Sequence, residues 1–506
     1  MQTLLNCGEV EPHPAAILAG LLPDARHEET HLSHVFITDQ DVYKLKKPLD
    51  LGFCDYTSID ARRDACRQEV LVNRRLADGL YRGVVPLTRE GGAFTIDGTG
   101  PVIDWLVHMR PFAMADRGDR AMANGRISPR KMRDFVDQLY AVHAETGHCP
   151  DDPWAARVAE LARTVAADVV EAATTPALKH EVLALEQQLA EQIATHRALL
   201  GRRGAHAILA TAHGDLHLQN LVLIEGEVIA YDALEFDPEL TRIDGFYDIA
   251  FLVMDLWHHG HEATAHAVMN RYLALDGHYA AIVLMPIYGA LRAMIRAMAA
   301  LLRNDAKAGE AYLQTAKAFL TPADKPEVIF ISGRSGTGKT SAAQALASTL
   351  RPPPGALHLR SDVLRKRRAG KMPEEPLPQS AYSEAAHRDL YAAYMEIVAC
   401  LRGQWPVIAD IALAGTAPPG ADDAAQLSDH RFWLDAPDDV LAARLSARKG
   451  DASDATAKVM EQQRQTPPGH DWKVVSAAGT INDTVSEIQN SLDKRHQLSP
   501  ALRPAR

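Results

Sequence analysis

The chain has 506 residues, of which 47% are hydrophobic and 24% charged, and its formal net charge is −11. This length allows roughly two to four domains, each able to bury its own core, and the composition excludes a disordered or collagen-like chain. The acidic balance disfavours nucleic acid or an anionic membrane as a partner, because their phosphates repel a negatively charged protein. We therefore expect a globular protein of several domains.

Cysteine use and the N-terminal sequence indicate the compartment. The five cysteines lie far apart and form no CxxC pair, which is typical of proteins kept in a reducing environment. The N-terminus has no basic region before an apolar stretch. The most apolar segment, residues 280–302, carries Arg292 and Arg296 one helical turn apart and predicts a buried helix instead of a membrane span. We expect a cytoplasmic protein without a membrane partner.

Residue patterns in the first part of the chain predict a small β-rich lobe followed by a larger helical lobe. Alternating apolar residues around a polar turn predict hairpins, and apolar residues three or four apart predict helices. In chain order, the expected elements are a hairpin at 35–47, a helix at 62–76, a strand at 102–109, helices over 127–200, a hairpin at 221–231 and further helices to 319. The lobes are expected at about 30–110 and 113–320, within a domain at 1–320.

A second domain is predicted after a polar, proline-containing linker at residues 321–327. Short apolar β runs then alternate with helical stretches, and these runs lie at 328–331, 356–359, 407–409 and 432–434. This alternation is typical of an α/β domain, in which helices cover a parallel sheet. We place this domain at 328–495 and expect a frayed tail at 496–506.

The sequence GRSGTGKT, at residues 333–340, fits the phosphate-binding loop pattern GxxxxGK[ST] directly between an apolar strand and a helix. Its glycines let backbone N–H groups surround phosphate oxygens, and the helix N-terminus adds positive partial charge. Lys339 can reach the β- and γ-phosphates of ATP, and the hydroxyl of Thr340 can bind Mg²⁺. The expected nucleotide contacts are Gly333, Arg334, Ser335, Gly336, Thr337, Gly338, Lys339 and Thr340.

Two carboxylates follow β runs of the same domain, at the edge where such sheets bind ligands. Asp410 ends the run VIAD and is expected to support Mg²⁺. Asp362 follows LHLRS and could accept a proton from a substrate hydroxyl; for both residues the alternative is a helix N-cap or a solvated turn. Arg444 and Arg448, one helical turn apart, could neutralise charge on the transferring phosphoryl group or lie on a solvated helix face.

Four segments of this domain, GRSGTGKT, LRSDVLRK, VIAD and RLSARKGDASDA, resemble those of the small P-loop kinases related to gluconate kinase, chloramphenicol phosphotransferase and zeta toxins. The resemblance extends over residues 328–495. It implies an α/β P-loop kinase domain in which Asp362 lies near the substrate hydroxyl and Arg448 belongs to a mobile lid.

The first domain carries HGDLHLQN at residues 213–220, which fits the catalytic-loop spacing HxDxxxxN of kinases. In this pattern Asp215 accepts the proton of the substrate hydroxyl and Asn220 binds Mg²⁺. Asp232 follows on the far side of a predicted hairpin, where its carboxylate can bridge the β- and γ-phosphates through the metal. Asp248 is expected to anchor the catalytic loop by accepting hydrogen bonds.

An upstream lysine and glutamate complete the set in the order that kinases need. Lys44 stands on the predicted strand and Glu69 on the following helix, as required for the ion pair that positions ATP. Lys46 points to the same strand face, so either lysine could contact ATP; we favour Lys44. The ordered set of lysine, glutamate, HxD, asparagine and aspartate predicts a kinase-type site.

The segment HGDLHLQN together with YDALEFDPELTRIDGFYDIAF resembles the aminoglycoside phosphotransferase and choline kinase branch of the protein-kinase-like fold, over residues 30–320. This implies an α+β protein-kinase-like domain, with the hinge that contacts adenine near residues 107–110. No GxGxxG pattern precedes Lys44, so no motif marks the turn that covers the phosphates; residues 30–34 are our candidate for it. The two halves in this order resemble bacterial proteins described as bifunctional aminoglycoside phosphotransferase/ATP-binding proteins.

The two sites together predict an ATP- and Mg²⁺-dependent phosphotransferase that transfers the γ-phosphoryl group to a hydroxyl of a small metabolite. Two other functions fit parts of the sequence. One half could be a nucleotide sensor that regulates the other half. The P-loop half could also be a polynucleotide or nucleotide-sugar kinase, which the basic run at residues 360–371 supports, although such a run is more typical of a solvated helix face.

Overall fold

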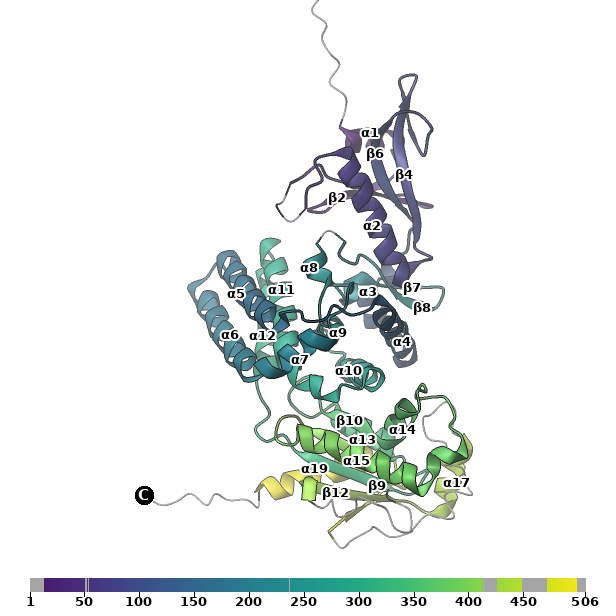
Figure 1. Cartoon of the computed structure of the whole chain (residues 1–506), viewed down its shortest axis with the longest axis vertical. Coiled ribbons are helices and arrows are strands. Elements are labelled where there is room, and N and C mark those ends of the chain that lie inside the picture. Colours follow the sequence, from purple (N-terminus) through teal and green to yellow (C-terminus); the bar gives the residue numbers. More distant parts are fainter. Residues whose placement is uncertain are drawn as a thin grey trace, which may run out of the picture. The chain divides into compact units, whose positions relative to one another are not determined.

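The computed structural model describes residues 13–50, 52, 54–235, 237–411, 413, 426–447 and 471–497 (Figure 1). The chain divides into two compact units. One unit comprises residues 1–152 and 203–248, and the other comprises residues 153–202 and 249–506.

The first unit contains a six-stranded antiparallel sheet in the order β1-β2-β3-β6-β4-β5. The elements of this part are α1 Pro14–Leu21, β1 Arg26–Glu29, β2 Ser33–Ile37, β3 Val42–Lys46, α2 Ile59–Ala77, β4 Tyr81–Glu90, β5 Ala93–Ile96 and β6 Val102–Met109. Helix α2 starts after Ser58, whose hydroxyl accepts a hydrogen bond from the N–H of Ala61, and it packs on β4 and β6. The predicted hairpin at 35–47, helix at 62–76 and strand at 102–109 are confirmed, whereas β1, β4 and β5 have no predicted counterpart.

The remainder of the first unit carries the catalytic-loop segment. Its elements are η1 Met114–Asp116, α3 Gly118–Ala123, α4 Pro129–Thr146, η2 Leu218–Asn220, β7 Leu221–Ile224, β8 Glu227–Ala230 and α8 Pro238–Thr241. Strands β7 and β8 form an antiparallel hairpin, as predicted for residues 221–231. Helix α7 Arg197–His206 and helix α9 Gly245–His258 each contain a boundary between the two units.

Helices make up the first part of the second unit. They are α5 Trp154–Ala172, α6 Pro176–Thr195, α10 Glu262–Asp276, η3 Tyr279–Leu284, α11 Met285–Leu302 and α12 Ala306–Leu320. By length and composition alone, η3 and α11 could together cross a membrane, but 83% of their apolar window is buried inside the protein. Arg292 lies over the ring of Phe251 at 4.6 Å, and Arg296 Nε lies 3.5 Å from Tyr312 Oη. The segment is therefore a buried core helix with a charged stripe, as predicted.

A five-stranded parallel sheet in the order β10-β11-β9-β12-β13 organises the rest of the second unit. The elements are β9 Val328–Gly333, α13 Lys339–Ala347, β10 Leu357–Arg360, α14 Ser361–Arg368, η4 Gln379–Tyr382, α15 Glu384–Leu401, β11 Val407–Asp410, β12 His430–Asp435, α17 Asp438–Ala447, β13 Lys473–Ser476 and α19 Ile481–Gln497. The four predicted β runs are confirmed as β9, β10, β11 and β12, and β13 has no predicted counterpart.

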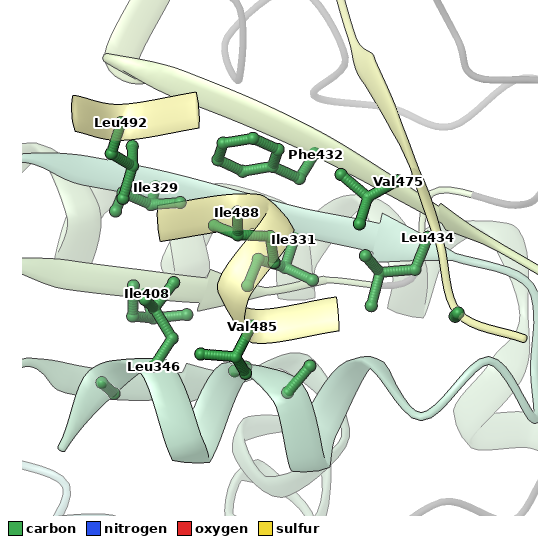
Figure 2. Packing of buried hydrophobic residues seen from close by; sticks show 14 of the residues in the cluster. Ile329, Ile331, Leu346, Ile408, Phe432, Leu434, Val475, Val485, Ile488 and Leu492 are labelled. Atoms are coloured by element: carbon green, nitrogen blue, oxygen red, sulfur yellow. The ribbon is translucent and has the colours of Figure 1, made fainter. Parts of the chain in front are cut away.

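Apolar side chains join this sheet to two of its helices. Figure 2 shows Ile329, Ile408 and Leu434 of the sheet gathered with Leu346 of α13 and Ile488 of α19 in one buried cluster. Burying such side chains from water is the main force that holds a sheet and its covering helices together. The fold is thus an α+β protein-kinase-like part followed by an α/β P-loop domain with a parallel sheet, as predicted.

Candidate functional site

A buried ion network joins strand β3 to helix α2. Lys44 Nζ lies 2.9 Å from Glu69 Oε1, and Lys46 Nζ lies 2.8 Å from Glu69 Oε2. The two lysines are two residues apart on β3, so they point to the same face of the sheet. One carboxylate without exposed surface therefore holds both lysines, and the predicted pairing of the strand with the helix is confirmed.

The same two lysines reach the segment that follows the β7–β8 hairpin. Lys44 Nζ also lies 2.9 Å from Asp232 Oδ1, and Lys46 Nζ lies 2.5 Å from Glu235 Oε1. The side chains of Lys44 and Asp232 are 16% and 50% exposed, whereas those of Lys46 and Glu235 are 1% and 7% exposed. The Lys44–Asp232 pair thus opens toward solvent, and the Lys46–Glu235 pair is internal. No role is predicted for Glu235. The feature of the sequence that could have identified it is its position as an acidic residue shortly after Asp232.

The charges of this network shift the pKa values of its members. Burial alone would raise the pKa of Glu69, but the two lysines outweigh it and lower that pKa to about 2. Burial alone would lower the pKa of Lys44, but Asp232 and Glu69 raise it well above its usual value. Burial raises the pKa of Glu235. Lys44 and Glu69 are therefore both charged at neutral pH, which suits a lysine that binds phosphate.

The catalytic-loop motif places Asp215 beside Asn220. Asn220 Nδ2 donates hydrogen bonds to the backbone O of Asp215 at 2.9 Å and to its Oδ2 at 2.8 Å. His217 Nε2 lies 3.3 Å from the same Oδ2. The side chain of Asp215 is 33% exposed, so it is accessible to a substrate. The amide oxygen of Asn220 is a suitable ligand for a hard cation.

Hydrogen bonds from the loop backbone fix this motif in place. Asp248 accepts them from the N–H groups of His213 and Gly214 at 3.0 and 2.9 Å, as predicted. The ring of His213 places Nε2 3.1 Å from the O of Tyr231, the residue before Asp232. One histidine therefore connects the catalytic loop to the segment that carries the metal-type carboxylate.

The backbone of Asp232 lies in the left-handed region, with a φ of +60°. A residue other than glycine is uncommon in this region, because the conformation costs energy and persists only where the surroundings impose it. The N–H of Asp232 donates to Tyr81 Oη at 3.2 Å, and the N–H of Ala233 donates to Asn73 Oδ1 at 2.8 Å. These bonds hold the strained residue in the position where its carboxylate meets Lys44.

An open pocket of about 810 Å³ lies beside the sheet of the first unit. Its walls come from the segment after β6, the start of β1 and the turn between β2 and β3, and they include Phe112, Met114, Arg26 and Ile37. Its volume falls in the range of small-molecule sites, which is about 300 to 1,000 Å³. The predicted hinge at 107–110 ends directly before this pocket, and the turn at 30–34 joins β1 to β2.

In the second unit, residues 333–340 link β9 to α13 through a turn with left-handed glycines. Gly336 and Gly338 have φ values of +88° and +80°, and a Cβ on Gly336 would lie 2.8 Å from the O of Leu441. Helix α13 starts at Lys339 without a side-chain cap, so its first N–H groups are available to a ligand. A tight glycine turn before an uncapped helix N-terminus suits phosphate oxygens.

Asp410 lies at the C-terminal end of β11, next to this helix. Thr340 Oγ1 donates to Asp410 Oδ2 at 2.7 Å, and His358 Nε2 lies 3.4 Å from the same oxygen. Burial alone would raise the pKa of Asp410, but the imidazole of His358 and the charge of Lys339 help to lower it to about 2. Burial raises the pKa of Asp362 in the first turn of α14, and Lys339 partly opposes this shift. The structure therefore brings Thr340 and Asp410 together and places Asp362 within the electrostatic range of Lys339.

Two arginines of this region bind protein groups. Arg334 Nη1 lies 2.7 Å from Asp438 Oδ1, at the start of α17. Because its side chain pairs with this carboxylate, the predicted contact of Arg334 with the nucleotide is left to its backbone N–H. Arg444 Nη1 lies 3.4 Å from the O of Thr337 and ties the other end of α17 to the phosphate-binding turn. Arg448 lies outside the described residues.

The basic run at 360–371 is partly internal. The side chain of Lys366 is buried, with 1% of the residue exposed. Arg367 donates hydrogen bonds to the backbone O of Leu275, at 3.3 Å, and to that of Asp276, at the C-terminus of α10. The expectation of a solvated helix face is therefore wrong for these two residues: Lys366 is buried, and Arg367 binds carbonyl groups of α10. The run also offers fewer free cations to a nucleic acid than its sequence suggests.

The donor sets of both sites fit Mg²⁺ and a nucleoside triphosphate. Thr340 and Asp410 supply a hydroxyl and a carboxylate 2.7 Å apart. Asn220 and Asp232 supply an amide oxygen and a carboxylate in the first unit. Oxygen ligands of these kinds are those that Mg²⁺ prefers, with phosphate oxygens completing its coordination. The glycine turn and uncapped helix fit the phosphates themselves.

Comparison with known proteins identifies one family match and several relatives. The family described as an AAA domain matches residues 328–468. Uncharacterized proteins of Mycobacterium tuberculosis and Mycobacterium bovis are each 26% identical over 491 residues, which cover 91% of this chain and 92% of theirs. The family match lies within the P-loop domain that the sheet topology defines, and these relatives span both halves of the chain.

Among solved structures, a gluconokinase from Sinorhizobium meliloti is similar with 20% identity and a TM-score of 0.26, covering 35% of this chain and 98% of its own. A choline/ethanolamine kinase family protein from Mesorhizobium loti is similar with 16% identity and a TM-score of 0.37, covering 60% of this chain and 90% of its own.

Proposed function

We propose that the chain is a cytoplasmic, ATP- and Mg²⁺-dependent phosphotransferase with two active sites, one in a domain at 1–320 and one in a domain at 328–495. Each site transfers the γ-phosphoryl group of ATP to a hydroxyl of a small metabolite. The observation that carries this proposal is the contact of Lys44 with both Glu69 and Asp232. A lysine held between a helix glutamate and a metal-type aspartate is the arrangement by which kinases position ATP.

In the first site, Lys44 binds the α- and β-phosphates, because its side chain is partly exposed and reaches Asp232. Asn220 and Asp232 hold Mg²⁺, which neutralises charge on the phosphates when it is bound. Asp215 takes the proton of the acceptor hydroxyl as the hydroxyl oxygen attacks the γ-phosphorus. The bond from the γ-phosphorus to the β-phosphate oxygen breaks, and the products are ADP and a phosphorylated alcohol.

In the second site, the turn at 333–340 encloses the triphosphate, with Lys339 toward the β- and γ-phosphates. Thr340 and Asp410 hold Mg²⁺. Asp362 accepts the proton of the acceptor hydroxyl, and its raised pKa suits a general base. Arg448 neutralises charge that develops on the transferring group. Positioning and charge neutralisation are sufficient here, because phosphoryl transfer needs little covalent chemistry from the protein.

The test compares wild type, Asp215→Asn and Lys339→Ala in a desalted bacterial metabolite extract with ATP and Mg²⁺. New phosphorylated species are followed by mass spectrometry. We expect Asp215→Asn to lose one product by about 10²- to 10⁴-fold and Lys339→Ala to lose a different one. Lys325→Ala is the control, because the side chain of Lys325 is 64% exposed and pairs with Glu327 in the linker. If wild type forms no product, or if neither substitution alters any product, the proposal is wrong.

A further inference from the structure

Helix α10 covers the outer edge of the P-loop sheet. Strand β10 is the last strand on one side of that sheet. Asn270 Oδ1 accepts a hydrogen bond from the N–H of His358 at 2.8 Å, and Asn270 Nδ2 lies 3.4 Å from the O of Ala356. His266 Nε2 lies 2.9 Å from the same carbonyl. The side-chain amide of Asn270 thus binds backbone N–H and C=O groups at the edge of the sheet, as the backbone of a neighbouring strand would.

Further contacts hold α10 firmly against the P-loop domain. Arg271 forms a bidentate ion pair with Glu374, with both N–O distances at 3.0 Å. Arg367 caps the C-terminus of α10, as described above. Gly355 lies so close to α10 that a Cβ on it would approach His266 Cδ2 to 2.9 Å. These contacts hold α10 against the segments that precede and follow β10.

A short path leads from this edge to the second active site. The backbone N–H of His358 contacts Asn270, while its ring places Nε2 3.4 Å from Asp410 Oδ2. The same carboxylate oxygen accepts the hydrogen bond from Thr340. His358 is thus hydrogen-bonded to α10 through its backbone N–H, and its ring lies beside the metal-type carboxylate.

We propose that Asn270 is a positioning residue for the second site: by fixing β10 it orients His358 and, through His358, the carboxylate of Asp410. This inference rests on the function proposed for that site. Partners that orient a metal-binding group contribute to the affinity for the metal. Their loss commonly lowers this affinity by about 10- to 100-fold. Loss of Asn270 therefore weakens Mg²⁺-dependent binding of ATP and leaves the glycine turn intact.

The experiment uses the full chain with Lys44→Ala as background, so that nucleotide binding reports the second site. Binding of a fluorescent ATP analogue is measured without metal and over a series of Mg²⁺ concentrations. We expect Asn270→Ala to raise the Mg²⁺ concentration for half-maximal binding by about tenfold, with metal-free binding unchanged. Hydrogen exchange of the peptide spanning 355–360 should also accelerate in the nucleotide-free protein. Glu262→Ala, in the exposed first turn of the same helix, should change neither measurement.

Two further variants separate the possible failures. Asn270→Asp keeps an acceptor for the N–H of His358, so it should retain most of the Mg²⁺ dependence even if Asn270→Ala folds poorly. Adding Asn270→Ala to His358→Gln should have little further effect, because both act through the same ring. If Lys339→Ala leaves binding intact, the proposed function of the second site fails. If Lys339→Ala abolishes binding but Asn270→Ala behaves like Glu262→Ala, the role of Asn270 is refuted.

Discussion

Replacing Lys46 with methionine tests whether the internal half of the ion network stabilises the fold. Lys46→Met removes the charge that now faces Glu235 and one oxygen of Glu69, both of which are buried. Removing one partner of a buried ion pair costs about 3 to 5 kcal/mol, because the remaining charge stays out of water. Protonation of Glu235 relieves part of this cost, since burial already raises its pKa. We expect the free energy of unfolding to fall by about 3 kcal/mol at neutral pH.

The loss should depend on pH in a defined direction. In the variant, the pKa of Glu235 in the folded state lies above its unfolded value, because burial opposes its charge and Lys46 no longer favours it. Such a group stabilises the folded state below the unfolded pKa, and this contribution is lost as the pH rises through the folded pKa. The variant should therefore be less destabilised at about pH 5 than at about pH 8.

The assay is urea-induced unfolding of the full chain, read by hydrogen exchange in peptides from β3 and α2 so that the first unit is observed by itself. Lys47→Met is the matched control, because the neighbouring Lys47 pairs with Glu29, which is 59% exposed, and should cost at most about 1 kcal/mol. Lys46→Met combined with Glu235→Gln should recover part of the loss. Equal unfolding free energies for Lys46→Met and Lys47→Met would refute the reasoning.

Two other predictions concern single residues of the sites. The pKa of Glu69 is lowered from 4.5 to about 2, so its ion pairs contribute on the order of 3 kcal/mol that is present above pH 4.5 and lost as the pH falls toward 2. Glu69→Gln should flatten the acid limb of a stability–pH curve, and an unchanged limb would contradict this assignment. Gly336→Ala should lower ATP affinity at the second site, because φ is +88° and the Cβ would lie 2.8 Å from a backbone oxygen. Gly201→Ala, where nothing lies within 4 Å of the added Cβ, is the control, and equal affinities would show that the turn tolerates a side chain.

Elements with a local signature were predictable from the sequence, and elements without one were not. The hairpin of β2 and β3 alternates apolar and polar residues around a polar turn, and the P-loop strand is a continuous apolar run. Strand β4 contains Gly83 and Pro86, which interrupt the pattern that indicates a strand. Strand β13 has four residues, of which the third alone is buried, so it lacks a core-facing pattern.

The candidate sites show the same distinction between local and long-range information. Asp215 and Asn220 stand at a fixed spacing within one loop, so the sequence contains their relationship. Glu235, one of the two partners of Lys46, is 189 positions away, and the carbonyl groups that Arg367 binds are 91 and 92 positions away. Such pairs are formed by the packing of distant segments, which composition and spacing do not encode. The interpretation of the basic run as a solvated helix face is wrong at Arg367 for this reason.

The cover that α10 provides for β10 also bears on how the chain can be divided. An uncovered edge strand presents unpaired N–H and C=O groups that can pair with another copy of the protein and seed aggregation. A fragment that starts at the polar linker, residues 321–327, lacks Asn270 and His266 and exposes the groups of β10 that they occupy. The polar linker is therefore a poor place to cut the chain, because a helix before it covers the edge of the sheet that follows it.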